Sequence, residues 1–116
     1  MIKLLTAVIR PHRLDAVRDA LLSAGVSGMT LTEVRGCDGS GDGDQTEVYR
    51  GAEYTVGAVS GIRIEVVVDL FEAERLAEAV TAAAFTGRPG DGKLWISEIE
   101  QVRRIRTGER GLEALQ

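Results

Sequence analysis

The sequence GIRIEVVVDLFEAERLAEAVTAAAFTGRPGDGK, residues 61–93, decides the fold. Its first nine residues are rich in Ile and Val and predict a strand over Gly61–Asp69. Asp69 then stands where an N-cap residue would begin a helix. Small apolar residues follow at helical spacing and allow close packing on a sheet, and Gly87 is expected to end this helix. The stripe comprises Ala73, Leu76, Ala77, Val80, Ala83 and Ala84.

Strands and a second helix surround this unit. A short apolar run over Leu4–Arg10 predicts a buried strand ended by proline. Helical spacing over Leu14–Leu22, with Gly25 as a stop, predicts a helix. Alternation over Met29–Arg35 predicts a half-buried strand, and Lys93–Ile99 is the fourth strand. The order β-α-β-β-α-β predicts an α+β, ferredoxin-like fold.

Composition limits the class of protein. A chain of 116 residues is expected to form one domain, 1–116. With 44% hydrophobic and 4% aromatic residues its core is small and aliphatic, which favours oligomerisation. We expect no membrane helix and no signal peptide. The single cysteine, Cys37, fits a cytoplasmic protein, and the net charge of −4 argues against non-specific nucleic-acid binding.

The segment Gly36–Ser60 differs from the rest of the chain. It is rich in glycine and carries five acidic residues against one base, Arg50. A connection this long in a small domain is usually functional or disordered. We therefore predict a mobile loop between the second and third strands, and a polar C-terminal segment over 103–116.

Two basic groups suit a phosphate chain. The turn Thr86–Lys93 combines three glycines, which let backbone N–H groups approach an anion, with the charge of Lys93. In an extended segment, Arg104 and Arg106 would project from one face. The alternatives are an ordinary glycine turn with a surface lysine, and a solvated strand face.

Several segments in one register carry a family resemblance. They are Ala7–Arg18, Met29–Val34, Tyr49–Tyr54, Ile62–Val68 and Thr86–Lys93. Together they resemble the PII family of signal-transduction proteins, over about residues 1–109 apart from one loop. The resemblance implies a homotrimer with the ferredoxin-like core, and it identifies residues 36–60 as the long T-loop of that family. It also implies a phosphate-binding loop at 86–93.

The resemblance implies that adenine nucleotides, ATP or ADP and possibly Mg, bind between neighbouring subunits. The positions that match phosphate-binding residues are Gly90, Asp91, Gly92, Lys93, Arg104 and Arg106. Those that match the adenine and ribose positions are Thr30, Gly36, Glu65 and Val67. An arginine that family members usually carry at the start of the T-loop is missing.

Other candidate sites are weaker. Tyr54 matches a T-loop tyrosine that some family members have nucleotidylylated, and the alternative is an ordinary loop tyrosine. Asp38–Asp44 resembles half of a calcium loop, but the position of the bidentate glutamate is Tyr49, so a flexible linker is favoured. His12 has no cysteine or second histidine nearby, so we expect no metal site. No nucleophile–base pair is evident, and we expect no enzyme.

The T-loop departs from the family where 2-oxoglutarate would bind. The lysine that pairs with a carboxylate is replaced by Gly61, and an early glutamine is absent. The resemblance therefore implies a regulator of an ammonium channel or a nitrogen-related enzyme, with impaired 2-oxoglutarate sensing. The alternatives are a PII-like regulator of a bicarbonate or metal transporter that reads ADP, AMP or another effector, and a CutA-like metal-binding protein. Neither nucleic acid nor membrane insertion is expected.

Overall fold

The computed structural model describes residues 1–37, 45–49, 52–56 and 58–115. The strands are β1 (Ile2–Ile9), β2 (Thr30–Cys37), β3 (Gln45–Tyr49), β4 (Ala52–Val56), β5 (Ala58–Asp69) and β6 (Gly92–Ile99). The helices are α1 (Leu14–Ser23) and α2 (Leu70–Ala84), with 3-10 turns at Pro11–Arg13 and Gly111–Leu115.

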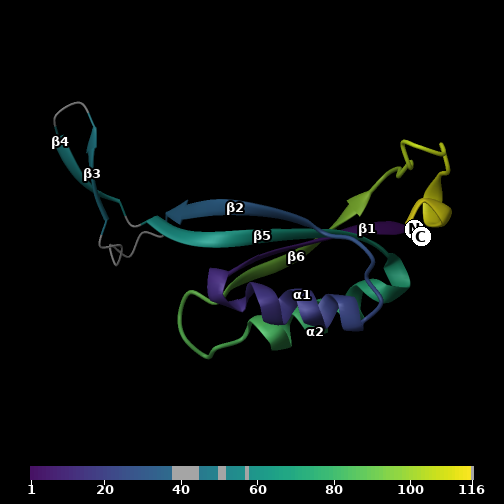
Figure 1. Cartoon of the computed structure of the whole chain (residues 1–116), viewed down its shortest axis with the longest axis horizontal. Helices are drawn as coiled ribbons and strands as arrows, with labels where there is room; N and C mark the ends of the chain where they lie inside the picture. The colour runs from purple at the N-terminus through teal and green to yellow at the C-terminus, as the bar shows by residue number, and fades with distance from the viewer. Residues whose placement is uncertain (38–44, 50–51, 57, 116) are drawn as a thin grey trace.

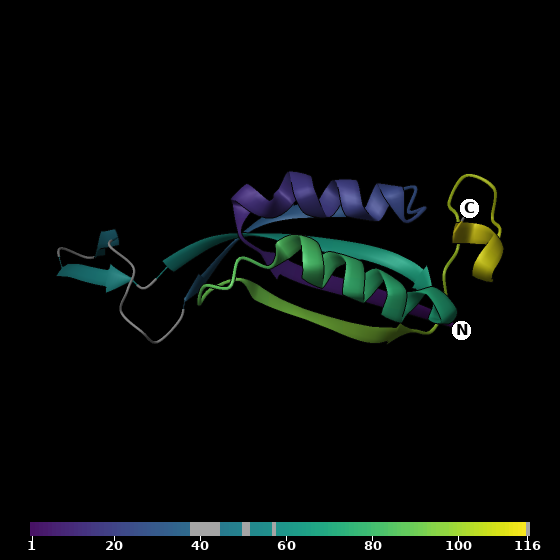
Figure 2. The same ribbon diagram turned by 90° about the horizontal axis from the view of Figure 1, so that it is seen from below.

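The main sheet has the strand order β2-β5-β1-β6, and each neighbouring pair is antiparallel. Both α-helices lie on one face of this sheet, side by side (Figure 1 and Figure 2). The predicted βαββαβ order and the ferredoxin-like fold are thereby confirmed. The opposite face carries no α-helix in the described part of the chain.

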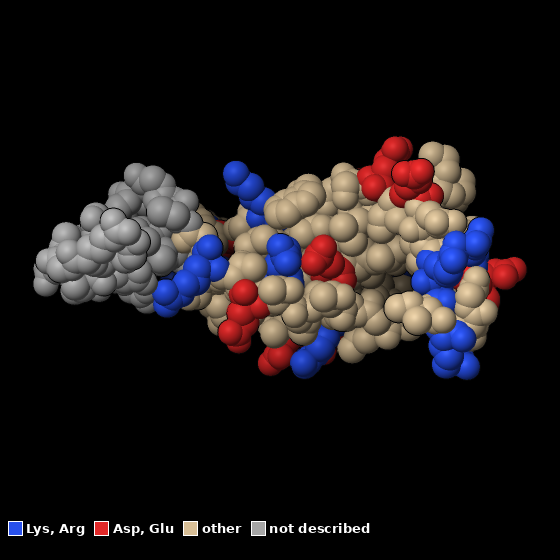
Figure 3. Space-filling model, turned by 90° about the horizontal axis from the view of Figure 1, so that it is seen from above, with Lys and Arg blue, Asp and Glu red and all other residues tan. Residues whose placement is uncertain are grey.

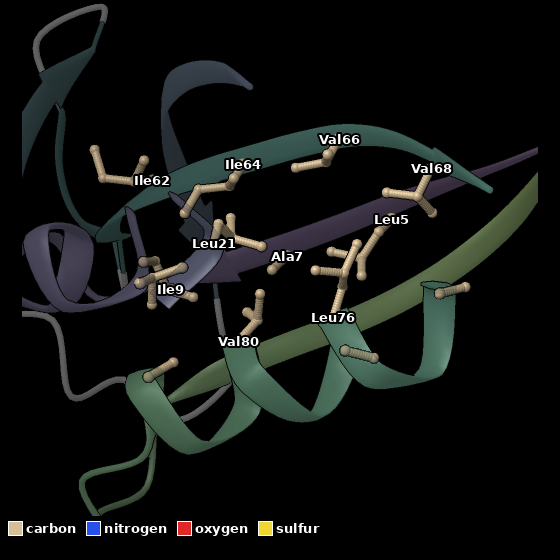
Figure 4. Packing of buried hydrophobic residues seen from close by; sticks show 14 residues of the cluster. Leu5, Ala7, Ile9, Leu21, Ile62, Ile64, Val66, Val68, Leu76 and Val80 are labelled. Carbon is tan, nitrogen blue, oxygen red and sulfur yellow. The ribbon is translucent and has the colours of Figure 1, made fainter. Parts of the chain in front are cut away.

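Alternation along β5 separates the two faces of the sheet. Its residues Ile62, Ile64, Val66 and Val68 are buried on the helix side, together with Leu5, Ala7 and Ile9 of β1. Figure 4 shows these side chains directed toward Leu76 and Val80 of α2. The side chains between them on β5, from Arg63 to Val67, face the helix-free side.

Both ends of α2 are capped by side chains. The carboxylate of Asp69 accepts a hydrogen bond from the Phe71 N–H at 3.2 Å, which confirms the predicted N-cap. At the other end, Arg13 donates from Nε and Nη2 to the Ala83 carbonyl at 2.9 and 2.6 Å. These bonds satisfy a carbonyl that has no partner within the helix.

The helix ends earlier than its sequence predicts. Its last residue is Ala84, because Phe85 already has extended backbone angles. Gly87, expected to end the helix, lies in the following turn with φ +84°. The apolar stripe itself is confirmed, with Ala83 partly buried and the other five members buried.

Two strands lie within the predicted T-loop. β3 and β4 pair only with each other among the described strands, from Gln45 with Val56 to Tyr49 with Ala52. Figure 1 shows them beyond the end of the main sheet. The acidic, glycine-rich composition concealed this pairing in the sequence. Residues 38–44, which include the candidate calcium loop, lie outside the described residues.

Candidate functional site

The carboxylate of Asp91 organises the glycine-rich turn between α2 and β6. It accepts hydrogen bonds from the Thr86 hydroxyl, from the Thr86 N–H at 2.8 Å and from the Gly87 N–H at 3.0 Å. The Nε of Arg10 donates to it at 3.1 Å. These contacts, the Thr86 bonds foremost, hold the pKa of Asp91 well below its usual value near 3.8, although partial burial acts the other way.

Close packing explains why this turn contains glycine. Gly90 and Gly92 have φ values of +96° and +106°, which side chains rarely adopt. A Cβ atom on Gly92 would lie 1.8 Å from the Val8 carbonyl oxygen. The fold alone therefore requires Gly92, whatever the turn binds. Because Gly92 starts β6, Lys93 comes to lie opposite Val8 on the neighbouring strand.

Beside the turn lies a hollow of about 760 Å³, here called the turn-side hollow. Five predicted nucleotide-binding residues line it: Gly36, Gly90, Asp91, Gly92 and Lys93. The sequence placed Arg88 within the phosphate-binding loop 86–93 without naming it as a ligand. It did not assign the further lining residues Arg10, Arg35, Ser60, Arg63 and Trp95 to this site. The alternation of β5 could have identified Arg63, since it shares a face with Gly61.

A second hollow, of about 690 Å³, lies beside the C-terminal segment and is here called the C-terminal hollow. Three predicted residues line it: Thr30, Glu65 and Val67. Leu112, Ala114 and Leu115 close one side of it. Leu112 and Leu115 were the signal that could have identified this side of the hollow, because leucines are unusual in a segment expected to be polar.

The two hollows occupy opposite ends of the sheet. Gly61 lines the first and Val67 lines the second, and six residues of extended strand separate them by about 20 Å. Between them, Arg63 and Glu65 line the adjoining rims of the two hollows and pair at 3.4 Å. Figure 3 shows the helix-free face, where basic side chains gather over the C-terminal segment and, separately, toward the end marked by grey residues. One chain therefore does not bring its predicted site residues together.

The predicted arginine pair is arranged differently from expectation. Residues 105–107 form a turn, closed by the Gly108 N–H bonding the Arg104 carbonyl at 2.8 Å. The expected extended segment with two arginines on one face is therefore wrong, since a turn breaks the alternation. Arg104 points back, with Nη1 3.0 Å from Glu109 Oε1, whereas Arg106 is exposed.

The structure adds little evidence on the other candidate sites. Tyr54 lies in β4 opposite Glu47, and its modification stays a prediction. Within the described ranges, no three His, Cys, Asp or Glu side chains come together as a metal site. Among the helices of the same ranges, none has the length and hydropathy to cross a membrane.

Comparison with known proteins identifies the family. The family model described as nitrogen regulatory protein P-II matches residues 2–109. A nitrogen regulatory protein P-II from Nostoc punctiforme is 50% identical over 113 residues, which cover 97% of this chain and 99% of the relative. The equivalent protein from Synechocystis is 49% identical with the same coverage. The crystal structure of Arabidopsis thaliana PII bound to citrate matches with a TM-score of 0.80 and 31% identity, over 99% of this chain and 90% of that one. This chain therefore belongs to the nitrogen regulatory protein P-II family.

Proposed function

We propose that this chain is a trimeric cytoplasmic regulator that binds ATP or ADP, alone or with Mg, in clefts between its subunits. The bound nucleotide biases the T-loop, residues 36–60, between arrangements that engage or release a partner in nitrogen metabolism. Membership of the P-II family supports the signalling role. The regulator needs no catalytic chemistry of its own.

The separation of the predicted ligands into two hollows carries this proposal. Lys93 and the glycines line the turn-side hollow, whereas Thr30, Glu65 and Val67 line the C-terminal hollow at the other end of the sheet. The far ends of the two hollows, at Gly61 and Val67, lie about 20 Å apart along β5, which disfavours one nucleotide reaching both sets of ligands on one chain. A nucleotide can use both if the turn-side hollow of one subunit meets the C-terminal hollow of the next.

Such a head-to-tail contact also explains a closed assembly. A surface at one end of a chain that binds a different surface at the other end is a heterologous interface, and three copies close into a ring when each is rotated by a third of a turn. Every cleft in this ring would then receive Lys93 from one subunit and Arg106 from its neighbour. We assign Asp91 to shaping the turn, because its oxygens already accept four hydrogen bonds.

A mixing experiment tests the shared site. Lys93→Ala and Arg106→Ala trimers should each bind ATP about ten- to hundredfold more weakly in calorimetry, because each loses a charge-assisted contact. When the two variants are co-refolded at equal amounts, about a quarter of the clefts should regain tight binding. In these clefts the Arg106→Ala subunit supplies Lys93 and the Lys93→Ala subunit supplies Arg106.

The controls separate the parts of the proposal. Light scattering must give a trimer for each variant, and a single-chain mass for the native protein would remove the shared cleft. Unchanged ATP affinity in both variants would exclude these two residues as phosphate ligands. Weak binding in both without recovery in the mixture would place the site within one chain.

We further propose that 2-oxoglutarate binds weakly or not at all. Gly61 lacks the cationic side chain of the family lysine, and a Cβ added there would lie 3.3 Å from both the Ile9 carbonyl oxygen and Val8 Cγ1. The nearest cation along the strand, Arg63, has Nε 3.4 Å from Glu65 Oε1. The missing contact alone is worth about ten- to hundredfold in affinity.

Calorimetry with saturating Mg-ATP measures this directly. We expect no low-micromolar binding of 2-oxoglutarate, and such binding would refute the impairment. Citrate belongs in the same titrations, because the Arabidopsis relative is described with citrate bound. A series with ADP, AMP and cyclic AMP tests the alternative of a regulator for another transporter, which a preference for AMP or cyclic AMP over ATP would favour.

A further inference from the structure

The turn-side hollow carries more positive charge than the predicted site assigns to it. Its basic lining residues are Arg10, Arg35, Arg63, Arg88 and Lys93. Among the described residues that line it, Asp91 is the one acid. Such an excess of cations favours an anionic ligand, but only cations that are not already paired are available to it.

Three of the five cations have other partners. Arg10 donates to Asp91 within the turn at 3.1 Å. Arg63 lies in an ion pair with Glu65, whose Oε1 is 3.4 Å from Nε. This Nε–H is buried and forms no hydrogen bond within the described structure, so the pair is electrostatic only. Arg35 also has an interaction partner.

Of the five basic lining residues, Arg88 and Lys93 remain available to bind a ligand. Neither side-chain cation has a hydrogen-bond or ion-pair partner among residues 1–37, 45–49, 52–56 and 58–115. Both residues are exposed, and both line the turn-side hollow. Arg88 lies within the glycine-rich turn, and Lys93 stands at its end.

The backbone of Arg88 is held by a hydrogen bond within the turn, which leaves its side chain as the part available to a ligand. Its N–H donates to the Thr86 hydroxyl oxygen at 3.2 Å, and Thr86 is itself bonded to Asp91. Pro89 restricts the backbone further. An anchor that is already ordered reduces the entropy lost when its side chain binds a ligand.

We propose that Arg88 is a second phosphate-binding cation, which acts with Lys93 and makes the hollow favour nucleotides that carry more phosphate charge. This inference rests on the proposed function, because it assigns the nucleotide to the same hollow. A guanidinium group bonds phosphate oxygens in pairs. Its attraction grows with the charge of the ligand, so ATP gains more from Arg88 than ADP, and ADP more than AMP.

Arg88→Ala tests the assignment, with Arg88→Lys as the conservative variant. Arg18→Ala is the matched control, since Arg18 is an exposed arginine of α1 that pairs with Asp15 at 3.2 Å, outside the hollow. Calorimetry on each trimer would follow ATP, ADP and AMP. We expect Arg88→Ala to weaken ATP binding about tenfold or more.

The expected pattern across the series is specific. AMP binding should weaken by less than about threefold in Arg88→Ala, and Arg88→Lys should recover part of the ATP affinity. Arg18→Ala should leave every affinity within about twofold. Thermal unfolding and light scattering should match the native protein, because the Arg88 side chain has no hydrogen-bond or ion-pair partner in the described part of the chain.

Each contrary result has a distinct meaning. If ATP affinity is unchanged in Arg88→Ala but falls in Lys93→Ala, Arg88 is not a ligand and the proposed function stands. Equal losses for ATP, ADP and AMP would overturn the charge preference. Native protein that binds none of the three would overturn both proposals.

Discussion

The glycine-rich turn and the C-terminal hairpin carry the two halves of the proposed site, yet they are held in different ways. The turn is locked to the sheet, since Gly92 lies against the Val8 backbone. The hairpin, closed by a bridge between Arg103 and Arg110, is held by polar contacts such as Arg104 with Glu109. At its tip, Ile105 is 99% exposed. One half of the proposed site is therefore fixed by close backbone packing on the sheet, whereas the other is held mainly by polar contacts within the hairpin.

Gly92→Ala should reduce the stability of the protein most, because it disrupts the packing of the glycine-rich turn against the sheet. The new Cβ would overlap the Val8 carbonyl oxygen at 1.8 Å, and the φ of +106° would strain any side chain. We expect a loss of about 3 kcal/mol or more in the free energy of unfolding, measured by urea denaturation.

The matched control for that variant is Gly108→Ala in the hairpin. Gly108 also has a positive φ, +76°, but an added Cβ would meet no atom within 4 Å. Backbone strain alone should cost about 1–2 kcal/mol. Equal losses in the two variants would show that the turn is no more tightly held than the hairpin.

Asp91→Asn should lower the stability of the fold by an intermediate amount. The pH dependence of that loss identifies the ionised carboxylate as its cause. The folded-state pKa of Asp91 lies below its unfolded value, so the native carboxylate stabilises the fold fully above about pH 3.9. This contribution should decline as the pH falls below that value and vanish below the folded-state pKa.

The measurement is thermal unfolding of native and Asp91→Asn protein between pH 7 and strongly acidic conditions. The difference between the two melting temperatures should stay constant down to about pH 4 and then shrink. A difference that already shrinks near neutral pH would assign the stabilisation to another group. Amide exchange at Thr86 and Gly87 should accelerate in the variant, because their N–H groups lose an ionised acceptor.

Glu109→Gln should have the smallest effect on stability. The Arg104–Glu109 pair is partly exposed, and such pairs contribute about 0–1 kcal/mol. We expect faster amide exchange at Gly108, whose N–H bonds the Arg104 carbonyl, and an unchanged turn at residues 86–92. A loss as large as that of Gly92→Ala would show that this ion pair holds the hairpin as firmly as packing holds the turn.

Local patterns predicted the elements well and the site less well. The period of two in β5, the apolar stripe of α2 and the Asp69 cap are confirmed, because each depends on residues close in sequence. The arrangement of Arg104 and Arg106 was wrong because the turn at 105–107 depends on a bridge between Arg103 and Arg110. The pairing of β3 with β4 was also missed, since glycines and acids conceal the alternation.

The sequence by itself determined the βαββαβ order, the glycine-rich turn and the resemblance to the P-II family, because spacing and residue type encode them directly. The tertiary structure alone decided which residues share a hollow. The register of β5 and β1 sets Gly61 and Val67 at opposite ends of the sheet, and the pairing of Val8 with Lys93 brings the turn against β1. Such distances depend on how distant strands align, which no local pattern specifies. They divide the proposed nucleotide ligands between two hollows, which neighbouring subunits would bring together in the proposed trimer.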